Sequence, residues 1–187
     1  WIIPDEWQVR DAWIRDKDGN KLIDFQKCNI HLVSYSEPVH DWFTFDELKE
    51  HLHFHDEFPE AIPYYTSYYN RDWGFCVNQA QYRQLSECEG RLEVMVDSDF
   101  DPDGSLTIGE LLIPGRSEQE ILISTYICHP SLANDNLSGA VMTAYLAREL
   151  LERELQWSYR FVWAPETIGA IAYCAMNEEV VREIHAG

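Results

Sequence analysis

In the second half of the chain, short apolar runs alternate with longer segments of helical periodicity. The runs at 106–113, 121–127 and 159–164 predict strands. Between the last two, apolar positions recur every three or four residues over 138–155, which predicts a helix, and helical patterning continues to His185. A strand–helix–strand unit implies parallel strands with helices outside the sheet. The apolar residues that recur at this spacing are Val141, Ala144, Tyr145, Ala147, Leu150 and Leu151.

The first part of the chain has a mostly β pattern. Residues that favour strands cluster over 7–14, 29–34 and 91–96. Turn signals stand at Asp18-Gly19 and at Asp103-Gly104. We therefore expect a β-rich region that ends in a hairpin with Asp103-Gly104 in its loop.

Two shorter segments break this β pattern. Residues 44–51 predict a helix with Thr44 as its N-cap. The aromatic-rich residues 64–75 fit neither strand nor helix periodicity, so we expect a structured loop. We interpret this loop as packing between two domains; alternatively, it forms a wall of a substrate cleft.

Candidate chemistry is concentrated in residues 128–139, which read Cys-His-Pro-Ser-Leu-Ala-Asn-Asp-Asn-Leu-Ser-Gly. The segment joins a predicted strand to a predicted helix, where α/β folds place their functional groups. His129 and Asp135 offer an imidazole nitrogen and a carboxylate oxygen, which are zinc ligands. The alternative is that Asp135 or Asn136 only caps the helix. Capping accounts for one polar residue but not for the whole run, so we favour a metal site.

Residues 133–139 resemble the motif of the zinc aminopeptidases that include bacterial leucyl aminopeptidase and glutamate carboxypeptidase. In that family the motif's Asp, here Asp135, bridges two zinc ions. A second resemblance lies in 161–169, which is similar to the segment that carries the family's Glu-Glu-x-Gly. Glu166 matches the Glu that acts as general base, whereas the second Glu, a zinc ligand, is replaced by Thr167. His129 is the candidate for the family's first His ligand.

The resemblance implies an α/β fold with a mostly parallel, zinc-exopeptidase-like sheet flanked by helices and a small β-rich inserted domain toward the N-terminus. It implies that residues 1–23 begin the aminopeptidase-like domain, that 24–110 form the insert, and that 111–187 belong to the α/β core. The chain starts at Trp1 without Met, and the family places a further Asp and His downstream of the Glu-Glu segment. We therefore expect the chain to be part of a longer protein.

The function that the resemblance implies is hydrolysis of the N-terminal residue of a peptide. His129 and Asp135 would bind one or two zinc ions, with the remaining ligands outside this chain. Glu166 would act as general base toward a zinc-activated water. The alternative is a non-catalytic relative that binds a peptide or an amino-sugar, and Thr167 in place of a ligand favours that alternative.

Composition narrows the choice of partners. Acidic residues number 33 against 14 basic ones, for a formal charge of −19. This balance argues against nucleic acid or an anionic membrane as partner and favours neutral or cationic substrates. The family resemblance implies a peptide or another small amine-bearing substrate. No apolar run approaches the length of a membrane span. The five Cys are scattered without a Cys-x-x-Cys pair, which indicates a reducing, cytoplasmic setting.

Two further patterns resemble metal sites. Residues 99–110 match the spacing of a calcium-binding loop, but the preceding run is β-like and Pro114 follows, so we prefer the hairpin. His51, His53 and His55 alternate along the chain, but neighbouring side chains on one strand face lie about 6.6 Å apart, too far for three to bind one ion. We interpret these His as a polar face.

Overall fold

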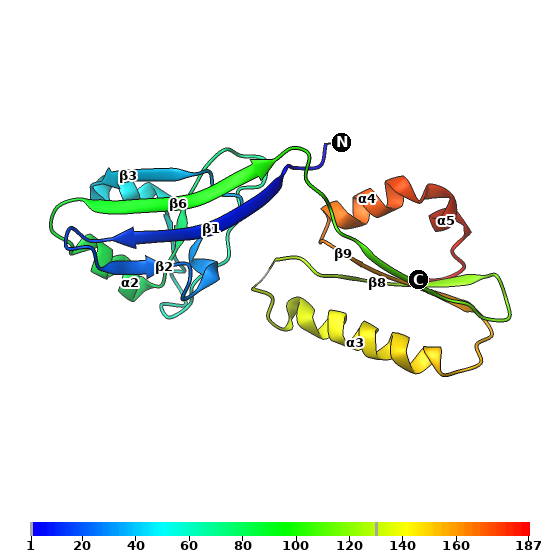
Figure 1. The fold of residues 1–187 in the computed structure, drawn as a ribbon. Helices are drawn as coiled ribbons and strands as arrows, with labels where there is room; N and C mark the ends of the chain where they lie inside the picture. Colours follow the sequence, from blue (N-terminus) through cyan, green and yellow to red (C-terminus); the bar gives the residue numbers. More distant parts are fainter. Residues whose placement is uncertain (1, 130) are drawn as a thin grey trace. The chain divides into compact units, whose positions relative to one another are not determined.

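The computed structural model describes residues 2–129 and 131–187 (Figure 1). The chain forms two compact units, residues 1–104 and 105–187. The expected division, with an inserted domain over 24–110, stays a prediction. No helix among the described residues is long and apolar enough to cross a membrane.

The first unit is built on an antiparallel sheet with strand order β2-β1-β6-β3. Its two long strands, β1 (Glu6–Arg15) and β6 (Leu92–Asp101), pair along their whole length, which confirms the strands expected over 7–14 and 91–96. β2 (Lys21–Asp24) and β3 (Val39–Phe43) flank them. Successive side chains of a strand point to opposite faces, and in β6 alternate residues are buried. These are Leu92, Val94, Val96 and Ser98.

The inner face of this sheet is covered by short elements. Thr44 forms a capping box with Glu47 at the start of α1 (Phe45–Leu48), as the sequence predicts, and a 3-10 turn (Lys49–His51) continues it. α2 (Gln79–Ser86) begins at Asn78 with a second capping box. The remaining elements are a 3-10 turn (Asn29–His31) and the paired short strands β4 (Leu52–His53) and β5 (Phe75–Cys76). The buried core includes Ala12, Ile14, Ile23, Leu48, Phe75, Val77 and Leu85.

Two of our expectations for the first unit are wrong. Residues 29–34 do not form a strand: they begin as the 3-10 turn, and Leu32 and Ser34 then make single bridges. Asp103-Gly104 lies in a turn but not in a hairpin, because β6 pairs with β1 and β3 rather than with the strand that follows. Residue types that favour strands indicate an extended backbone, but they do not determine which strand a segment pairs with. Strand pairing depends on contacts between residues far apart in sequence.

The three alternating His contact three different aromatic rings. His51 stacks on Trp73 with ring centroids 3.9 Å apart, and His53 stacks on Tyr65 at 4.4 Å. His55 lies edge-on to Phe58. Burial lowers the pKa of His53, which favours the neutral ring. The three imidazoles therefore serve as packing groups in the first unit.

All five Cys are free thiols. Burial raises the pKa of Cys76 to about 12, which keeps this thiol protonated and unreactive.

The second unit contains a three-stranded sheet with strand order β7-β9-β8. β8 (Glu120–Tyr126) and β9 (Ser158–Ala164) are parallel and are joined by the long helix α3 (Asn134–Leu151). β7 (Gly109–Ile113) is antiparallel to β9. α4 (Ile168–Met176) and α5 (Glu178–Glu183) follow. The expected β-β-α-β-α order is confirmed, whereas a mostly parallel sheet is not: among the described strands, only β8–β9 and the two-residue β4–β5 pair run parallel.

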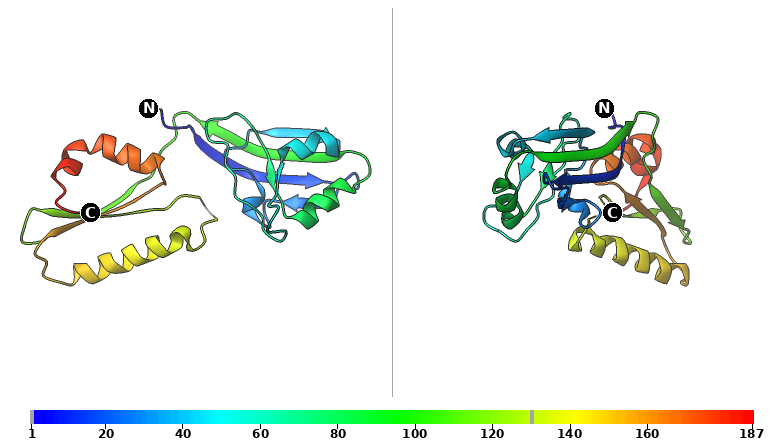
Figure 2. Two further views of the ribbon diagram at one scale, coloured as in Figure 1. Left: turned by 180° about the vertical axis from the view of Figure 1, so that it is seen from behind. Right: turned by 60° about the vertical axis from the view of Figure 1, so that its left-hand side comes forward.

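Helices cover both faces of this sheet, with α3 on one side and α4 and α5 on the other (Figures 1 and 2). Side chains of the central strand β9 pack against the helices on both faces of the sheet. Phe161 packs toward α3 together with Ile113 and Ala147, while Val162 packs on the opposite face with Tyr173 of α4. A strand buried on both faces reads as a continuous apolar run, and residues 161–164 at the end of β9 form such a run.

The expected apolar stripe of α3 is buried only in part: Ala147 and Leu150 pack against the sheet. Thr143 and Ala147 face the sheet, whereas Val141, Tyr145 and Leu151 are exposed. α3 carries apolar residues around much of its circumference, so periodicity alone could not identify which stripe meets the sheet.

We predict that Phe75→Ala destabilises the first unit by about 3–5 kcal/mol, because Phe75 is fully buried and its removal leaves a cavity. Urea denaturation followed by fluorescence measures the change. Phe58→Ala is the matched control, since Phe58 is 60% exposed and should shift the midpoint little. Equal effects of the two substitutions would contradict this description of the core.

Candidate functional site

A pocket of about 250 Å³ lies at the carboxyl ends of β8 and β9. The two strands pair in register up to Tyr126 and Ala164, and the amide of Ile127 donates to the carbonyl of Ala164 at 3.0 Å. The segments that leave both strands therefore begin side by side, the usual place for a site in an α/β sheet. The pocket is lined by apolar side chains and a few polar ones, including Leu122, Thr125, Tyr126, Glu166, Thr167 and Tyr173.

Asp135 is held at this end of the sheet by Tyr126, whose phenol donates a hydrogen bond to the Asp135 carboxylate. Asp135 itself is exposed and has a non-helical backbone (φ −94°, ψ 103°) within the first turn of α3. Since Tyr126 also lines the pocket, Asp135 is attached directly to the pocket wall.

The capping role that we considered for Asp135 or Asn136 is taken by Asn136. Its Oδ1 accepts from the amide of Gly139 at 3.2 Å, and its Nδ2 donates to Thr125 Oγ1 at 2.6 Å and to the Tyr126 carbonyl at 2.9 Å. Asn136 thus fastens the start of α3 to the end of β8. Neighbouring residues have separate roles, because Asn136 makes the structural bonds while the Asp135 carboxylate bonds to Tyr126.

Gly139 is required by this arrangement. A Cβ at this position would lie 2.3 Å from Asn136 Oδ1 and 2.6 Å from Thr125 Oγ1. The last residue of the 133–139 motif therefore leaves room for the Asn136 contacts, which explains a glycine inside a helix, where it is otherwise unfavourable.

Glu166 lines the same pocket from the turn that follows β9. The next residue, Thr167, has a positive φ of 56°, a conformation that a β-branched residue rarely adopts. The amide of Gly169 then donates to the Pro165 carbonyl at 3.1 Å, and a Cβ on Gly169 would lie 2.6 Å from the Pro165 ring. A tight, strained turn thus holds Glu166 at the pocket, and strain of this kind is concentrated at functional sites.

His129 follows the end of β8 by three residues and is partly buried. Pro130, the third residue of the Cys-His-Pro segment, lies outside the described residues. Within the described parts of the chain, no three His, Cys, Asp or Glu side chains are grouped so that they could hold a metal ion. The structure therefore places Glu166 in the pocket wall and bonds Asp135 to Tyr126, another residue of that wall. His129 lies on the segment that follows β8.

A family model described as Domain of unknown function (DUF4910) matches residues 1–187. The chain belongs to this DUF4910 family. It is 46% identical over its whole length to a Clostridium acetobutylicum protein named "Putative polysaccharide biosynthesis protein with aminopeptidase-like domain" and covers 42% of that protein. It is also similar to a crystal structure titled putative peptidase from Clostridium acetobutylicum, with 46% identity and a TM-score of 0.93. That match covers 98% of this chain and 43% of the other.

The chain therefore spans less than half the length of these relatives. Their names indicate a peptidase-like or aminopeptidase-like protein, and the α/β arrangement of the second DUF4910 unit is shared with the solved structure.

The sequence patterns alone did not identify Thr125 and Tyr126. These two polar residues end strand β8, just before the segment 128–139 that carries Asp135. That position is the signal that could have identified them, since ligand-orienting groups often lie next to the ligands.

An ion-pair network supports the far side of the pocket. Arg160 of β9 makes a bidentate pair with Glu120, at 2.6 and 2.9 Å, and also binds Glu110. Tyr173 lines the pocket and donates to Glu110 at 3.1 Å. Burial and the nearby Glu110 carboxylate raise the pKa of Tyr173, so its phenol stays protonated at neutral pH. This network fixes β7, β8 and β9 to one another.

We predict that Gly139→Ala destabilises the second unit by at least about 1 kcal/mol, although Gly to Ala inside a helix normally stabilises by a similar amount. The new methyl group would displace Asn136 from its bonds. Thermal denaturation measures the effect. The reverse substitution next to it, Ala140→Gly, should cost only the usual helix propensity of about 1 kcal/mol. A stabilised Gly139→Ala variant would contradict the proposed role of Asn136.

Proposed function

We propose that this chain carries one part of the active centre of a metal-dependent aminopeptidase, with Asp135 and His129 as metal ligands and Glu166 as general base. The observation that supports the proposal most strongly is that Asp135 bonds to a residue of the pocket that Glu166 lines. Tyr126 lines this pocket and bonds to the Asp135 carboxylate, while Glu166 lines the same pocket from the adjacent parallel strand. Asp135 and Glu166 are held by different contacts at neighbouring strand ends. One carboxylate can therefore act as metal ligand and the other as general base.

The donor chemistry of these residues fits zinc. Imidazole nitrogen and carboxylate oxygen are both zinc ligands, and a ligating carboxylate is commonly oriented by a hydrogen bond from a second residue. Tyr126 provides that bond for Asp135. A catalytic zinc centre has about three protein ligands and one open position, so His129 and Asp135 supply two. We propose that the remaining ligands are provided by sequence outside residues 1–187, since the relatives are more than twice as long.

When bound, zinc would lower the pKa of a water molecule and polarise the substrate carbonyl. Glu166 would accept a proton as water attacks the peptide carbonyl and would return it to the leaving amine. The strained turn at Thr167 would keep the Glu166 carboxylate aimed at the pocket without rearrangement. The apolar walls, formed in part by Leu122 and Val162, would contact the substrate and exclude bulk water.

The substrate that we propose is a peptide or another small molecule with a free amine. The strong negative charge of the chain favours an amine-bearing substrate. The Clostridium acetobutylicum relative is named a polysaccharide biosynthesis protein, so amide bonds in an amine-bearing saccharide precursor are a second substrate class worth screening.

The alternative function is non-catalytic binding of a peptide or an amino-sugar in the same pocket. Thr167 favours this alternative, because a hydroxyl is a poor replacement for a carboxylate ligand of zinc. The two functions differ in whether a tightly held metal is needed.

We predict that Asp135→Ala removes zinc, whereas Glu166→Gln keeps zinc but lowers hydrolysis of aminoacyl anilides by about 10²–10⁴-fold, as expected when a general base is lost. The measurements are zinc content by mass spectrometry after dialysis and initial rates. They use the chain together with any sequence that flanks it in its gene. Glu152→Ala, an exposed carboxylate at the other end of α3, is the control for charge loss.

If neither the native protein nor the Glu152→Ala control retained zinc, the catalytic proposal would fail and ligand binding without a metal would replace it. Normal turnover in Glu166→Gln would remove Glu166 from the mechanism.

A separate prediction concerns Tyr126. Tyr126→Phe should weaken zinc binding by about 10–100-fold, the usual effect of removing a bond that orients a metal ligand. Competition with a chelator gives the affinity. Tyr159→Phe removes a hydroxyl from the neighbouring strand β9 and should leave zinc affinity unchanged. A Tyr126→Phe variant with native affinity would show that the phenol does not support the metal site.

A further inference from the structure

The first unit contains a second pocket of about 250 Å³, formed by segments far apart in the sequence. Residues 2–5 form one side, and Phe100, at the end of β6, contributes another part of the wall. Two loops supply the rest. The pocket-lining residues with aromatic or charged side chains are Asp5, Tyr35, Tyr68, Tyr69, Arg71 and Phe100.

The backbone of this pocket is strained at two aromatic residues. Tyr35 has φ 67° and Tyr68 has φ 46°. Among the described residues, the only other non-glycine residue with positive φ is Thr167, which lines the pocket of the candidate active site. Strain of this kind costs about 1–3 kcal/mol per residue and is concentrated at ligand clamps and active sites. Its presence in both pockets suggests that this one also has a function.

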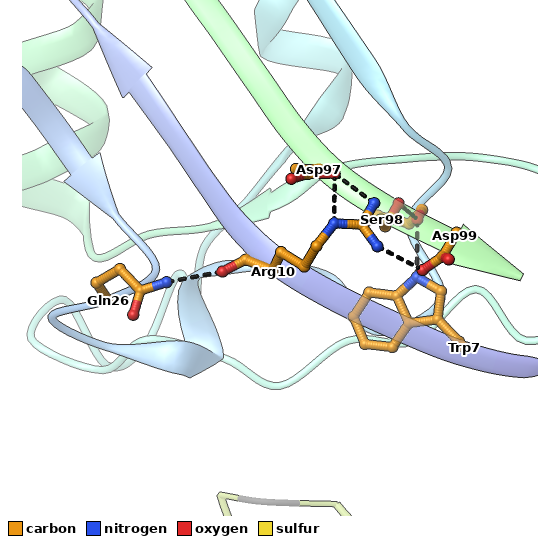
Figure 3. Close-up of polar contacts among 7 residues, drawn as sticks. Trp7, Arg10, Gln26, Asp97, Ser98 and Asp99 are labelled. Carbon is orange, nitrogen blue, oxygen red and sulfur yellow. Dashed lines mark hydrogen bonds and ion pairs between the residues drawn. The ribbon is translucent and has the colours of Figure 1, made fainter.

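Hydrogen bonds hold the strained segment in place. The Tyr35 carbonyl accepts from Ser67 Oγ at 2.9 Å. The carbonyl of the next residue, Ser36, accepts from the Trp7 indole at 3.0 Å and from Ser98 Oγ at 2.8 Å. Figure 3 shows Trp7 and Ser98 approaching from the two neighbouring strands β1 and β6. These bonds hold the backbone at Tyr35 and Ser36 in place.

The aromatic side chains form a platform. Tyr35 stacks on Trp7 with the rings nearly parallel at 5.8 Å, and Tyr68 lies against Tyr35 at 5.5 Å. Phe100 lies 6.3 Å from Tyr35. Tyr68 and Tyr69 are nevertheless 37% and 58% exposed, so part of this aromatic surface faces the solvent.

Polar groups border the platform. The guanidinium of Arg71 lies over the Phe100 ring at 4.4 Å. It is 3.6 Å from an Asp5 carboxylate oxygen and 3.9 Å from one of Glu37. At these distances the charges attract without forming hydrogen bonds. The Arg71 N–H groups and the Asp5 carboxylate, which both line the pocket, therefore keep capacity to bond a ligand that has both donors and acceptors.

We propose that this pocket binds one neutral pyranose unit of a saccharide. The C–H groups on one face of a pyranose ring suit an aromatic platform, while its hydroxyls can donate to Asp5 and accept from Arg71. The pocket is slightly smaller than the roughly 300–1,000 Å³ of sites for drug-sized ligands, which matches a single ring.

The charge of the pocket selects a neutral ligand. Asp5 and Arg71 both line the pocket, and their opposite charges lie 3.6 Å apart. An anionic ligand would have to compete with the Asp5 carboxylate for Arg71, and a cationic ligand would have to compete with Arg71 for Asp5. A hydroxyl-rich neutral ring avoids both costs. This inference is independent of the metal centre proposed for the second unit.

The test measures binding of the protein to a glycan array and then determines Kd by fluorescence titration with methyl β-D-glucopyranoside and with a neutral disaccharide. The key variant is Tyr68→Gly, because glycine adopts the positive φ of residue 68 without strain and removes only the ring. Arg71→Ala removes the hydrogen-bond donors. We expect each variant to bind at least tenfold more weakly than the native protein, with an unchanged or raised denaturation midpoint for Tyr68→Gly.

The control is Tyr145→Ala, which removes an exposed tyrosine of the second unit and should bind like the native protein. Binding of the disaccharide but not of the monosaccharide glycoside would support the pocket as a site for a unit within a glycan. The absence of any neutral saccharide ligand, binding restricted to charged sugars, or native affinity in both Tyr68→Gly and Arg71→Ala would overturn the proposal. None of these results depends on zinc or on hydrolysis.

Discussion

The candidate active site depends on the parallel pairing of β8 with β9. Because the pairing runs in register to Tyr126 and Ala164, the segments that leave the two strands start at the same edge of the sheet. One segment leads to Asp135 and the other to Glu166. A shift by one residue would turn Tyr126 to the opposite face and separate it from the pocket. Phe161 and Val162 of β9 are both buried, on opposite faces of the sheet, and their packing into the two layers keeps the pairing in this register.

Around this edge, structural and chemical tasks are divided between adjacent residues. Asn136 fastens α3 to β8, while Asp135 beside it bonds to Tyr126. Gly139 allows the close approach that Asn136 needs. Thr167, the residue after Glu166, has an unfavourable positive φ. A carboxylate with such fixed surroundings loses little conformational entropy when it acts, which is how a scaffold prepares a site before the substrate arrives.

In the first unit, too, a rigid sheet holds functional side chains in place. Its sheet is held by β1–β6 pairing and by Arg10, which binds Asp97 and Asp99 across the two strands (Figure 3). The hydrogen bond from Arg10 lowers the pKa of Asp97 and keeps this carboxylate ionised. A rigid sheet of this kind can hold Tyr35 in a conformation that an isolated loop would not adopt.

The sequence by itself determined the order of elements in the second unit, the Thr44 cap and the 133–139 motif, because apolar periodicity, capping chemistry and short motifs are local properties. It also located Asp135 and Glu166 as candidates. Tertiary structure alone decided that β7 runs antiparallel to β9, which stripe of α3 is buried, and that Tyr126 supports Asp135. It also assembled the aromatic pocket from residues 2–5, Tyr35, Tyr68 and Phe100. These outcomes depend on contacts between residues distant in sequence, whose energies no local pattern encodes.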